Sequence, residues 1–394
     1  MVTTVDEHAA HVARLLAPAL APGAETVALD DALGRVTTAA VASPVDLPLF
    51  RNSQMDGFAV RSADLSTIPA QLLVVGDIPA MALNPRPIEH GMAARIMTGA
   101  VMPEGADAVV PVEDTTTDGG TVVIARARTV GEYVREKGSD LHAGDQLLPA
   151  GLRLGSRHLA ALAAAGITAI EVRAVVRVAV ITTGTEIVQP GITPVLGQVF
   201  DSNATALAAA VRSCGATVSY RAHVGDDTAL MGRALADAAA HADLILTSGG
   251  ISMGDYEVVR QTLEPLGAAV TSIAMQPGGP QATAVFEGVP VVCFPGNPVS
   301  TQLSFEIFVA PLLREVAGLP PAVRAPRTLA TAARSVAGRR QFLRGRALPG
   351  GRVELVSGAS SHLVAGLAAS DLLIDVPADV TSLEAGATVE TWEL

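Results

Sequence analysis

The second half of the chain alternates between two hydrophobic patterns. From residue 175 onward, short apolar runs that fit buried strands are each followed by a segment whose apolar residues recur at helical spacing. The predicted strands are 175–181, 217–224, 244–247 and 291–294. The predicted helices are 202–214, 228–241, 256–266 and 300–316. Strands and helices that alternate in this way predict a doubly wound domain around a parallel sheet, over residues 174–319.

The first part of the chain has a different pattern. Helical spacing over 6–20 and over 29–33 stops where Pro44 and Pro48 break it. Short β-like runs separated by Gly, Pro and Asp turns follow, at 71–76, 108–112 and 121–127. Residues 155–170 predict a helix that ends at Gly166, with 167–172 extended. We therefore predict a mostly β domain, 44–139, inserted into a helical and extended linking domain formed by 1–43 and 140–173.

The last part of the chain follows a proline-rich linker near residues 319–326. Its β-like runs are interrupted by turns at 349–351 and 377–379. We predict a C-terminal β-barrel-like domain over 320–394. The predicted fold class is therefore multidomain, α/β and β.

Glycine-rich loops follow three of the predicted strands, at 182–186, 247–255 and 295–298. Ligands bind at the carboxyl edge of a doubly wound sheet, so these loops should face one crevice. Glycine allows close approach to the main chain, and bared N–H groups can hold an anion. Ser252 and Asp255 have capping-box spacing, and the start of a helix also favours anions. The edge predicts a phosphorylated or oxyanionic ligand, and the alternative is a set of structural turns without a ligand.

Three acidic residues, Glu186, Asp226 and Asp255, fall at the same predicted edge. Carboxylates alone would repel a phosphate, whereas a bridging Mg²⁺ would join the two. The sequence therefore predicts a magnesium site formed by these three residues.

Composition excludes some classes of protein. The formal net charge of −12 argues against a general nucleic-acid-binding role. We expect no membrane partner, because no apolar span reaches membrane length, and residues 6–8 are polar where a signal peptide needs a basic and then apolar run. Cys214 and Cys293 are expected to be buried free thiols, which predicts a reduced, cytoplasmic location. Lys137 is the only lysine.

Four motifs together resemble the MoeA family, the molybdopterin molybdenumtransferases, which are also similar to the gephyrin E domain. They are N-S-Q-M-D-G-F-A-V-R at 52–61, R-I-M-T-G-A-V-M-P-E-G-A-D-A-V-V at 95–110, T-S-G-G-I-S-M-G-D-Y at 247–256 and F-P-G-N-P-V-S at 294–300. The resemblance covers nearly the whole chain. It implies four domains and a homodimer whose crevices lie between the doubly wound domain of one subunit and the β domain of the other. It also implies a reaction in which molybdate is inserted into adenylylated molybdopterin, with Mg²⁺ and with release of AMP.

The resemblance also implies site residues. Those expected to be catalytic are Asp56, Thr98, Asp140, Glu186, Asp226 and Asp255, of which the last three would hold the metal. Those expected to bind the substrate are Thr183, Gly184, Ser248, Gly249, Gly250, Ser252, Pro295, Gly296, Asn297, Pro298, Arg344 and Ser361. By contrast, His223, His241 and His362 are expected to be structural or rim residues.

One departure from the family pattern concerns charge. Where the family often has Lys-Pro-Gly-Lys-Pro, this chain has Gln276-Pro277-Gly278-Gly279-Pro280. The change predicts an anion pocket with less fixed positive charge, and Arg344 could compensate. Two alternative functions remain at this point: a gephyrin-like scaffold, and a molybdopterin adenylyltransferase, although the latter enzymes lack the β insertion and the terminal domain. A molybdopterin adenylyltransferase is also a candidate partner.

Overall fold

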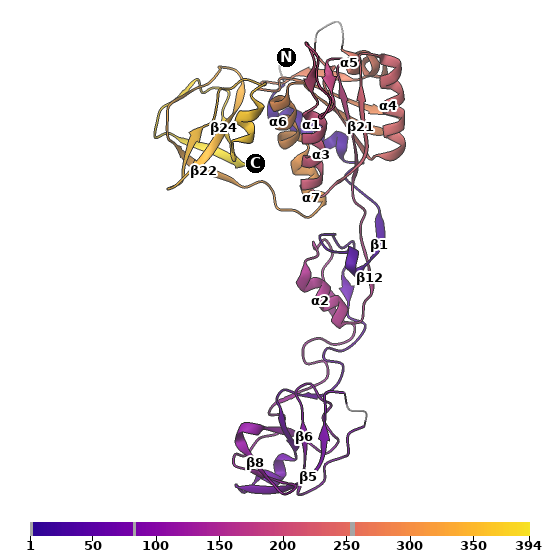
Figure 1. The fold of residues 1–394 in the computed structure, drawn as a ribbon, viewed down its shortest axis with the longest axis vertical. Helices are drawn as coiled ribbons and strands as arrows, with labels where there is room; N and C mark the ends of the chain where they lie inside the picture. Colours follow the sequence, from indigo (N-terminus) through magenta and orange to yellow (C-terminus); the bar gives the residue numbers. More distant parts are fainter. Residues whose placement is uncertain (1–2, 82–83, 253–256) are drawn as a thin grey trace. The chain divides into compact units, whose positions relative to one another are not determined.

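The computed structural model describes residues 3–81, 84–252 and 257–394 and forms two compact units (Figure 1). Unit 1 consists of residues 1–25 and 173–394, and unit 2 consists of residues 26–172. The chain of unit 2 is therefore continuous, whereas unit 1 is assembled from two segments.

A six-stranded sheet forms the centre of unit 1, in the order β16-β13-β17-β21-β20-β18. Its strands are β13 (Arg177–Thr183), β16 (Thr217–Val224), β17 (Leu244–Ser248), β18 (Ala269–Ser272), β20 (Pro280–Phe286) and β21 (Val289–Phe294). β16, β13, β17 and β21 are parallel, as predicted, and β17 is buried at every residue. β20 and β18 add an antiparallel extension, which the sequence pattern did not predict.

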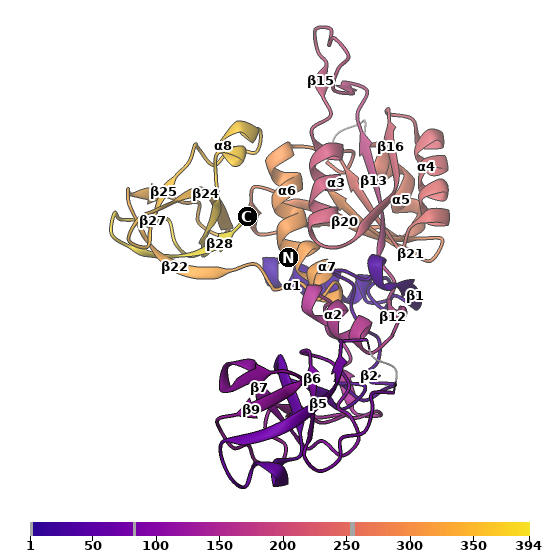
Figure 2. The same cartoon turned by 60° about the horizontal axis from the view of Figure 1, so that its bottom comes forward.

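Helices cover both faces of this sheet, which explains why its strands are apolar on both sides. α3 (Asn203–Ser213), α6 (Pro298–Phe308) and α7 (Ala310–Val316) lie on one face, and α4 (Thr228–His241) and α5 (Val258–Leu263) lie on the other (Figure 2). Alternate residues of each strand point to opposite faces: Leu244 and Leu246 pack in the first core, and Ile245 packs in the second. The predicted doubly wound architecture is confirmed.

Two predicted helices differ from those observed. The single helix expected over 300–316 is two helices, because Pro311 lacks the N–H needed to continue α6 and lies in the first turn of α7. The helix expected to start at residue 256 starts at Val258, and Glu257 is its N-cap residue. The predicted capping partner Asp255 lies outside the described residues.

The first helix, α1 (Val5–Leu16), belongs to unit 1 and not to the linking domain predicted over 1–43. Thr4 caps it: Glu7 N donates to Thr4 Oγ1 (3.2 Å), and Thr4 N donates to Glu7 Oε2 (2.8 Å). Val12 and Leu16 are buried in the core that also contains α6. The apolar stripe correctly predicted a helix, but such a stripe does not specify which surface the helix will cover.

The C-terminal region is a closed barrel. Strands β24 (Arg340–Leu348), β25 (Arg352–Leu355), β22 (Arg324–Leu329), β28 (Thr388–Glu393) and β26 (Leu372–Val376) pair in that order, and β26 pairs with β24 to close the ring. Short strand β19 (Met275–Gln276) pairs with the outer end of β24. The barrel also carries α8 (Val364–Ala368) and the pair β23 (Ala333–Arg334) and β27 (Ser382–Leu383). This confirms the predicted β-barrel-like domain.

Unit 2 contains a second six-stranded sheet, in the order β7-β4-β6-β5-β9-β8. Its strands are β4 (Gly57–Val60), β5 (Ala70–Ile78), β6 (Met92–Ile96), β7 (Ala108–Pro111), β8 (Thr115–Asp118) and β9 (Thr121–Ile124). A Cβ on Gly57 would lie 2.1 Å from the Val110 carbonyl oxygen, so β4 and β7 can pair this closely only with glycine there.

The rest of unit 2, as far as the structure describes it, contains paired short strands, the short 3₁₀ helix η1 (Leu29–Asp31) and one α-helix. The pairs are β1 (Ala24–Ala28) with β12 (Ala169–Arg173), β2 (Val41–Ala42) with β11 (Gln146–Leu148), and β3 (Asn52–Ser53) with β10 (Val134–Arg135). The helix is α2 (Ser156–Ala164). Within the three described ranges, no helix is both long enough and apolar enough to cross a membrane.

Candidate active site

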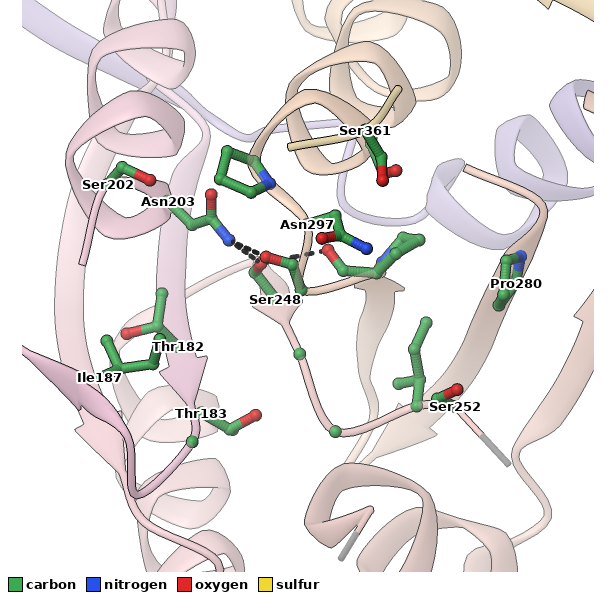
Figure 3. Close-up of a pocket in the computed structure, with 18 of the residues that line it drawn as sticks. Thr182, Thr183, Ile187, Ser202, Asn203, Ser248, Ser252, Pro280, Asn297 and Ser361 are labelled. Atoms are coloured by element: carbon green, nitrogen blue, oxygen red, sulfur yellow. Dashed lines mark hydrogen bonds between the residues drawn. The ribbon is translucent and has the colours of Figure 1, made fainter. Parts of the chain in front are cut away.

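A pocket of about 870 Å³ opens at the carboxyl edge of the unit 1 sheet (Figure 3). Loops after β13, β17 and β21 form its walls, together with residues from 276 to 280 and residues 359–361 of the barrel region. The sequence-predicted residues that line it are Thr183, Gly184, Glu186, Asp226, Ser248, Gly249, Gly250, Ser252, Pro295, Gly296, Asn297, Pro298 and Ser361. The convergence expected from the strand ends is therefore observed.

Glycines allow the loops to come together. Gly249 and Gly250 have φ of 95° and 68°, and a Cβ on Gly249 would lie 2.7 Å from Thr183 Oγ1. A Cβ on Gly296 would lie 3.3 Å from Gly249 Cα. Two backbone N–H groups of this loop are already paired within the chain: Gly249 N donates to Phe294 O (3.1 Å), and Ser252 N donates to Glu257 Oε2 (2.7 Å).

A hydrogen-bonded network joins the start of α3, the end of β17 and the loop after β21 (Figure 3). Asn203 Nδ2 donates to Ser248 Oγ (2.9 Å) and to Gly296 O (2.7 Å). Thr301 Oγ1 lies 3.0 Å from Ser248 Oγ and donates to Pro295 O (2.6 Å). Neither Asn203 nor Thr301 was among the site residues predicted from the sequence. The only available signal was the position of Asn203, where a helix starts beside the predicted edge.

Two buried polar atoms on the pocket residues have no partner. Thr183 Oγ1 and Asn203 Oδ1 make no hydrogen bond to any part of the chain that the structure describes. A buried polar group without a partner is costly, so such groups identify places where a ligand or water completes the structure. Both atoms are suited to a polar ligand, since a hydroxyl can donate or accept and an amide oxygen accepts.

The predicted metal ligands are only partly gathered. Glu186 and Asp226 are exposed and line the pocket, and Asp226 Oδ2 accepts a hydrogen bond from Thr185 Oγ1 (2.7 Å). Asp255 lies outside the described residues. Among the residues placed by the structure, no group of three or more His, Cys, Asp or Glu side chains could hold a metal ion. The two carboxylates therefore offer oxygen ligands but do not form a complete cage.

Another acidic residue of the wall has a structural role. Asp201 is buried and accepts hydrogen bonds from Thr182 Oγ1 (2.6 Å) and Ala204 N (2.9 Å), which anchors the start of α3. His223 Nδ1 lies 3.2 Å from the same Thr182 hydroxyl. His223 thus adjoins the pocket wall without lining it.

The described pocket wall contains no lysine, arginine or histidine side chain. Gln276 lines it, with Oε1 accepting from Gln341 Nε2 (2.9 Å), whereas Gly279 is not part of the lining. The wall thus has a neutral side chain, Gln276, where the family often has a lysine, which agrees with the predicted reduction in positive charge.

Arg344 does not line the pocket in this structure. It is buried, and its guanidinium donates to Ser360 O (3.2 Å) and to Gly358 O, so it holds the loop that carries Ser361. Burial lowers the pKa of Arg344 from its usual value. Nη1 has no partner among the described residues. The motif identified the residue, but its contacts are those of a loop support.

Two predicted residues of unit 2 are in direct contact. Asp56 Oδ1 accepts hydrogen bonds from Thr98 N and from Thr98 Oγ1, both at 2.7 Å. These bonds, with a smaller effect of Arg95, hold the pKa of Asp56 below its usual value. Asp140 is exposed, and its N–H donates to Leu47 O (2.9 Å). The structure thus presents an ionised carboxylate at Asp56 in a fixed orientation.

These features define a multidomain α/β protein whose ligand pocket lies at the carboxyl edge of a doubly wound sheet. Three family models match successive parts of the chain: the MoeA N-terminal region (domains I and II) over residues 3–166, a probable molybdopterin-binding domain over 179–315, and the MoeA C-terminal region (domain IV) over 326–394.

Relatives match over almost the full length. A protein named molybdopterin molybdenumtransferase 2 from Mycobacterium tuberculosis is 41% identical over 387 residues, which cover 94% of this chain and 95% of that one. A molybdopterin molybdenumtransferase from Nostoc is 40% identical over 304 residues, which cover 75% of this chain and 70% of that one. The crystal structure of a MoeA protein from Pyrococcus has a TM-score of 0.84 and 32% identity, and covers 100% of this chain and 99% of its own. The chain belongs to the MoeA family of molybdopterin molybdenumtransferases, which are transferases.

Proposed function

We propose that this protein inserts molybdate into adenylylated molybdopterin and releases AMP, as a step of molybdenum cofactor biosynthesis. The observation that carries the proposal is the large polar pocket at the sheet edge, most of whose lining lies within the region matched by the molybdopterin-binding model. Its glycine loops, its network around Ser248 and its unpartnered Thr183 hydroxyl suit a ligand rich in oxygen atoms.

Small polar groups would hold and orient the ligand in this proposal. Ser248, Ser300 and Ser361 present hydroxyls from three different segments, and Asn297 adds an amide at the start of α6. Groups fixed in advance around a reacting centre contribute to catalysis by position and electrostatics, so no nucleophilic side chain is required.

Magnesium fits the carboxylates that line the pocket. Mg²⁺ binds oxygen ligands and usually retains several waters, so Glu186 and Asp226 would hold it without a closed protein cage. When bound, it would supply positive charge beside the phosphate groups of the substrate. Asp255 completes the ligand set that we propose, although it lies outside the described residues.

The remaining parts of the proposal concern assembly and location. We propose a homodimer in which the hydrogen-bonded pair Asp56 and Thr98 of one subunit contributes to the pocket of the other, as the family resemblance implies. A molybdopterin adenylyltransferase would be the partner that supplies the adenylylated substrate. The two buried free cysteines support a reduced, cytoplasmic location.

Molybdate-dependent release of AMP tests the function. Purified protein, adenylylated molybdopterin and Mg²⁺ should release AMP only after molybdate is added. The variant Ser248→Ala should keep its fold. It should release AMP more slowly than wild type, by roughly ten- to a thousandfold, the scale for removal of a preorganised polar group. A gephyrin-like scaffold would release no AMP, and an adenylyltransferase would consume ATP; either result would contradict the proposal.

A further inference from the structure

The pocket has one apolar end. Short strands β14 (Ile187–Val188) and β15 (Val199–Phe200) pair there, and Ile187, Val199 and Phe200 contribute to the wall. Most of the other lining side chains are polar, proline or glycine. The apolar end lies beside Thr182 and Thr183, as the labelled Ile187 shows in Figure 3.

Phe200 is the one aromatic side chain in the pocket wall within residues 3–81, 84–252 and 257–394. It is 49% exposed. An aromatic ring left half in water forfeits much of the stabilisation that burial would give, so a contact that covers it is favourable. A ligand in the pocket can provide that contact.

The backbone around Phe200 is held in place before any ligand arrives. Val199 N donates to Glu186 O (2.9 Å), and Asp201 N donates to Val188 O (2.8 Å). The next side chain, Asp201, is buried and doubly hydrogen-bonded. A ring carried between such anchors requires little ordering on binding, which lowers the entropic cost of a contact with it.

We infer that Phe200 is a specificity-determining residue that stacks against a flat heteroaromatic ring of the substrate, with the phosphate groups directed toward the glycine loops. The inference rests on the proposed function, because adenylylated molybdopterin has a ring system on either side of its phosphates. The pocket has the matching division, an apolar end on β14 and β15 and a polar wall around Ser248. Either the adenine or the pterin provides the same flat π surface.

The neighbouring loop supplies a matched control. Leu196 is fully exposed on the segment that joins β14 to β15, and it is not among the pocket-lining residues. If the apolar side chains of this segment served only to dock another protein, Leu196 and Phe200 would behave alike in partner binding, and neither would affect a small ligand.

Calorimetric titrations separate the two rings. AMP, ribose 5-phosphate and 6-hydroxymethylpterin are titrated into wild type, Phe200→Ala, Phe200→Tyr and Leu196→Ala. Phe200→Ala should weaken binding of AMP or of the pterin by roughly 5- to 150-fold, the scale for loss of one base–aromatic stack, and leave ribose 5-phosphate unchanged. Phe200→Tyr should retain the wild-type affinity, as should Leu196→Ala. The ring whose binding falls is the one that Phe200 receives.

Kinetics distinguish this inference from the proposed function. With adenylylated molybdopterin, Phe200→Ala should raise KM and leave kcat nearly unchanged, because stacking acts equally on the ground and transition states. Equal affinities of wild type and Phe200→Ala for both ring-bearing probes, or no binding of either probe to wild type, would overturn the inference. A third outcome is that the wild-type protein releases no AMP, while Phe200→Ala binds the ring-bearing probes more weakly than wild type does. The proposed function would then be wrong, and the inferred ring site would be supported.

Discussion

The charges of single side chains determine what the pocket requires of its ligand. Glu186, Asp226 and Glu257 line it, and no cationic side chain of the described wall offsets them. In the proposed function, a dianionic ligand such as molybdate would therefore depend on Mg²⁺ and on neutral donors more than it would beside a lysine.

A charge restored at Gln276 should strengthen oxyanion binding. Gln276 lines the pocket, so Gln276→Lys places an ammonium group at the wall and should tighten molybdate binding by about 1.5–3 kcal/mol, the scale for a hydrogen bond to a charged group. Molybdate titrations at low and moderate salt measure this. Gly279→Lys is the control, because Gly279 is outside the lining and a Cβ there would lie 3.3 Å from Ile273 O. Equal affinities of wild type and a folded Gln276→Lys variant would contradict the prediction.

For single residues, the sequence motifs predicted which residues line the pocket better than they predicted the hydrogen bonds that the side chains make. Ser248, Gly250 and Asn297 line the pocket because each lies at or just after the end of a strand, and parallel strands end at one edge. The contacts of Arg344 were not predictable in the same way. Its guanidinium donates hydrogen bonds to the carbonyl oxygens of Gly358 and Ser360. Which acceptors lie within its reach depends on how the barrel packs.

At the scale of elements, the packing of α1 shows how far periodicity reaches. The predicted helix is correct, but it does not pack in the linking domain to which it was assigned. Its apolar face packs in the unit 1 core that also contains α6. The antiparallel strands β18 and β20 were missed for a related reason. β20 is buried at four successive positions, so it lacks the alternation that identifies a strand with one wet face.

The packing of α1 predicts a pH dependence. His8 is buried, its ring lies edge-on to Phe308 at 4.7 Å between centroids, and burial lowers the pKa of His8 to about 4. A histidine whose folded pKa is depressed binds protons more readily when unfolded, so its stabilisation is present above pH 6.5 and is lost as the pH falls toward 4. At pH 4 the loss should reach about 3 kcal/mol.

Substitution of His8 isolates this effect from the titration of carboxylates. His8→Leu should unfold in denaturant with a midpoint that falls less between pH 7 and pH 4.5 than the wild-type midpoint does. His90→Leu is a suitable control, because the side chain of His90 is exposed. Parallel pH profiles for wild type and His8→Leu would show that His8 contributes no proton-linked stability.

At the scale of the whole molecule, the proposed homodimer makes a prediction about mixed subunits. Asp56 lies in unit 2 and Asp226 lies in unit 1. If each active site takes Asp56 from one subunit and Asp226 from the other, a dimer of one Asp56→Ala chain and one Asp226→Ala chain keeps one intact site.

Co-expressed variants test this arrangement. Random pairing makes half of the dimers mixed, each with one of two sites intact, so AMP release should recover to about a quarter of the wild-type rate. Each variant alone is the control and should be nearly inactive. A mixture no more active than its parents would mean that both residues act within one subunit, or that Asp56 acts elsewhere.

The division of unit 1 into two chain segments has a consequence for protein synthesis. β1 and β12 pair where the chain enters and leaves unit 2, and Ala174 N donates to Gly23 O (2.7 Å) beside that junction. On the ribosome, α1 emerges before unit 2, yet its buried face packs in the core that also contains α6 (Pro298–Phe308), which is made much later. Unit 2, a continuous stretch, is complete by residue 172. We therefore expect unit 2 to fold before α1 finds its place in unit 1, which would leave the apolar stripe of the nascent helix accessible to chaperones.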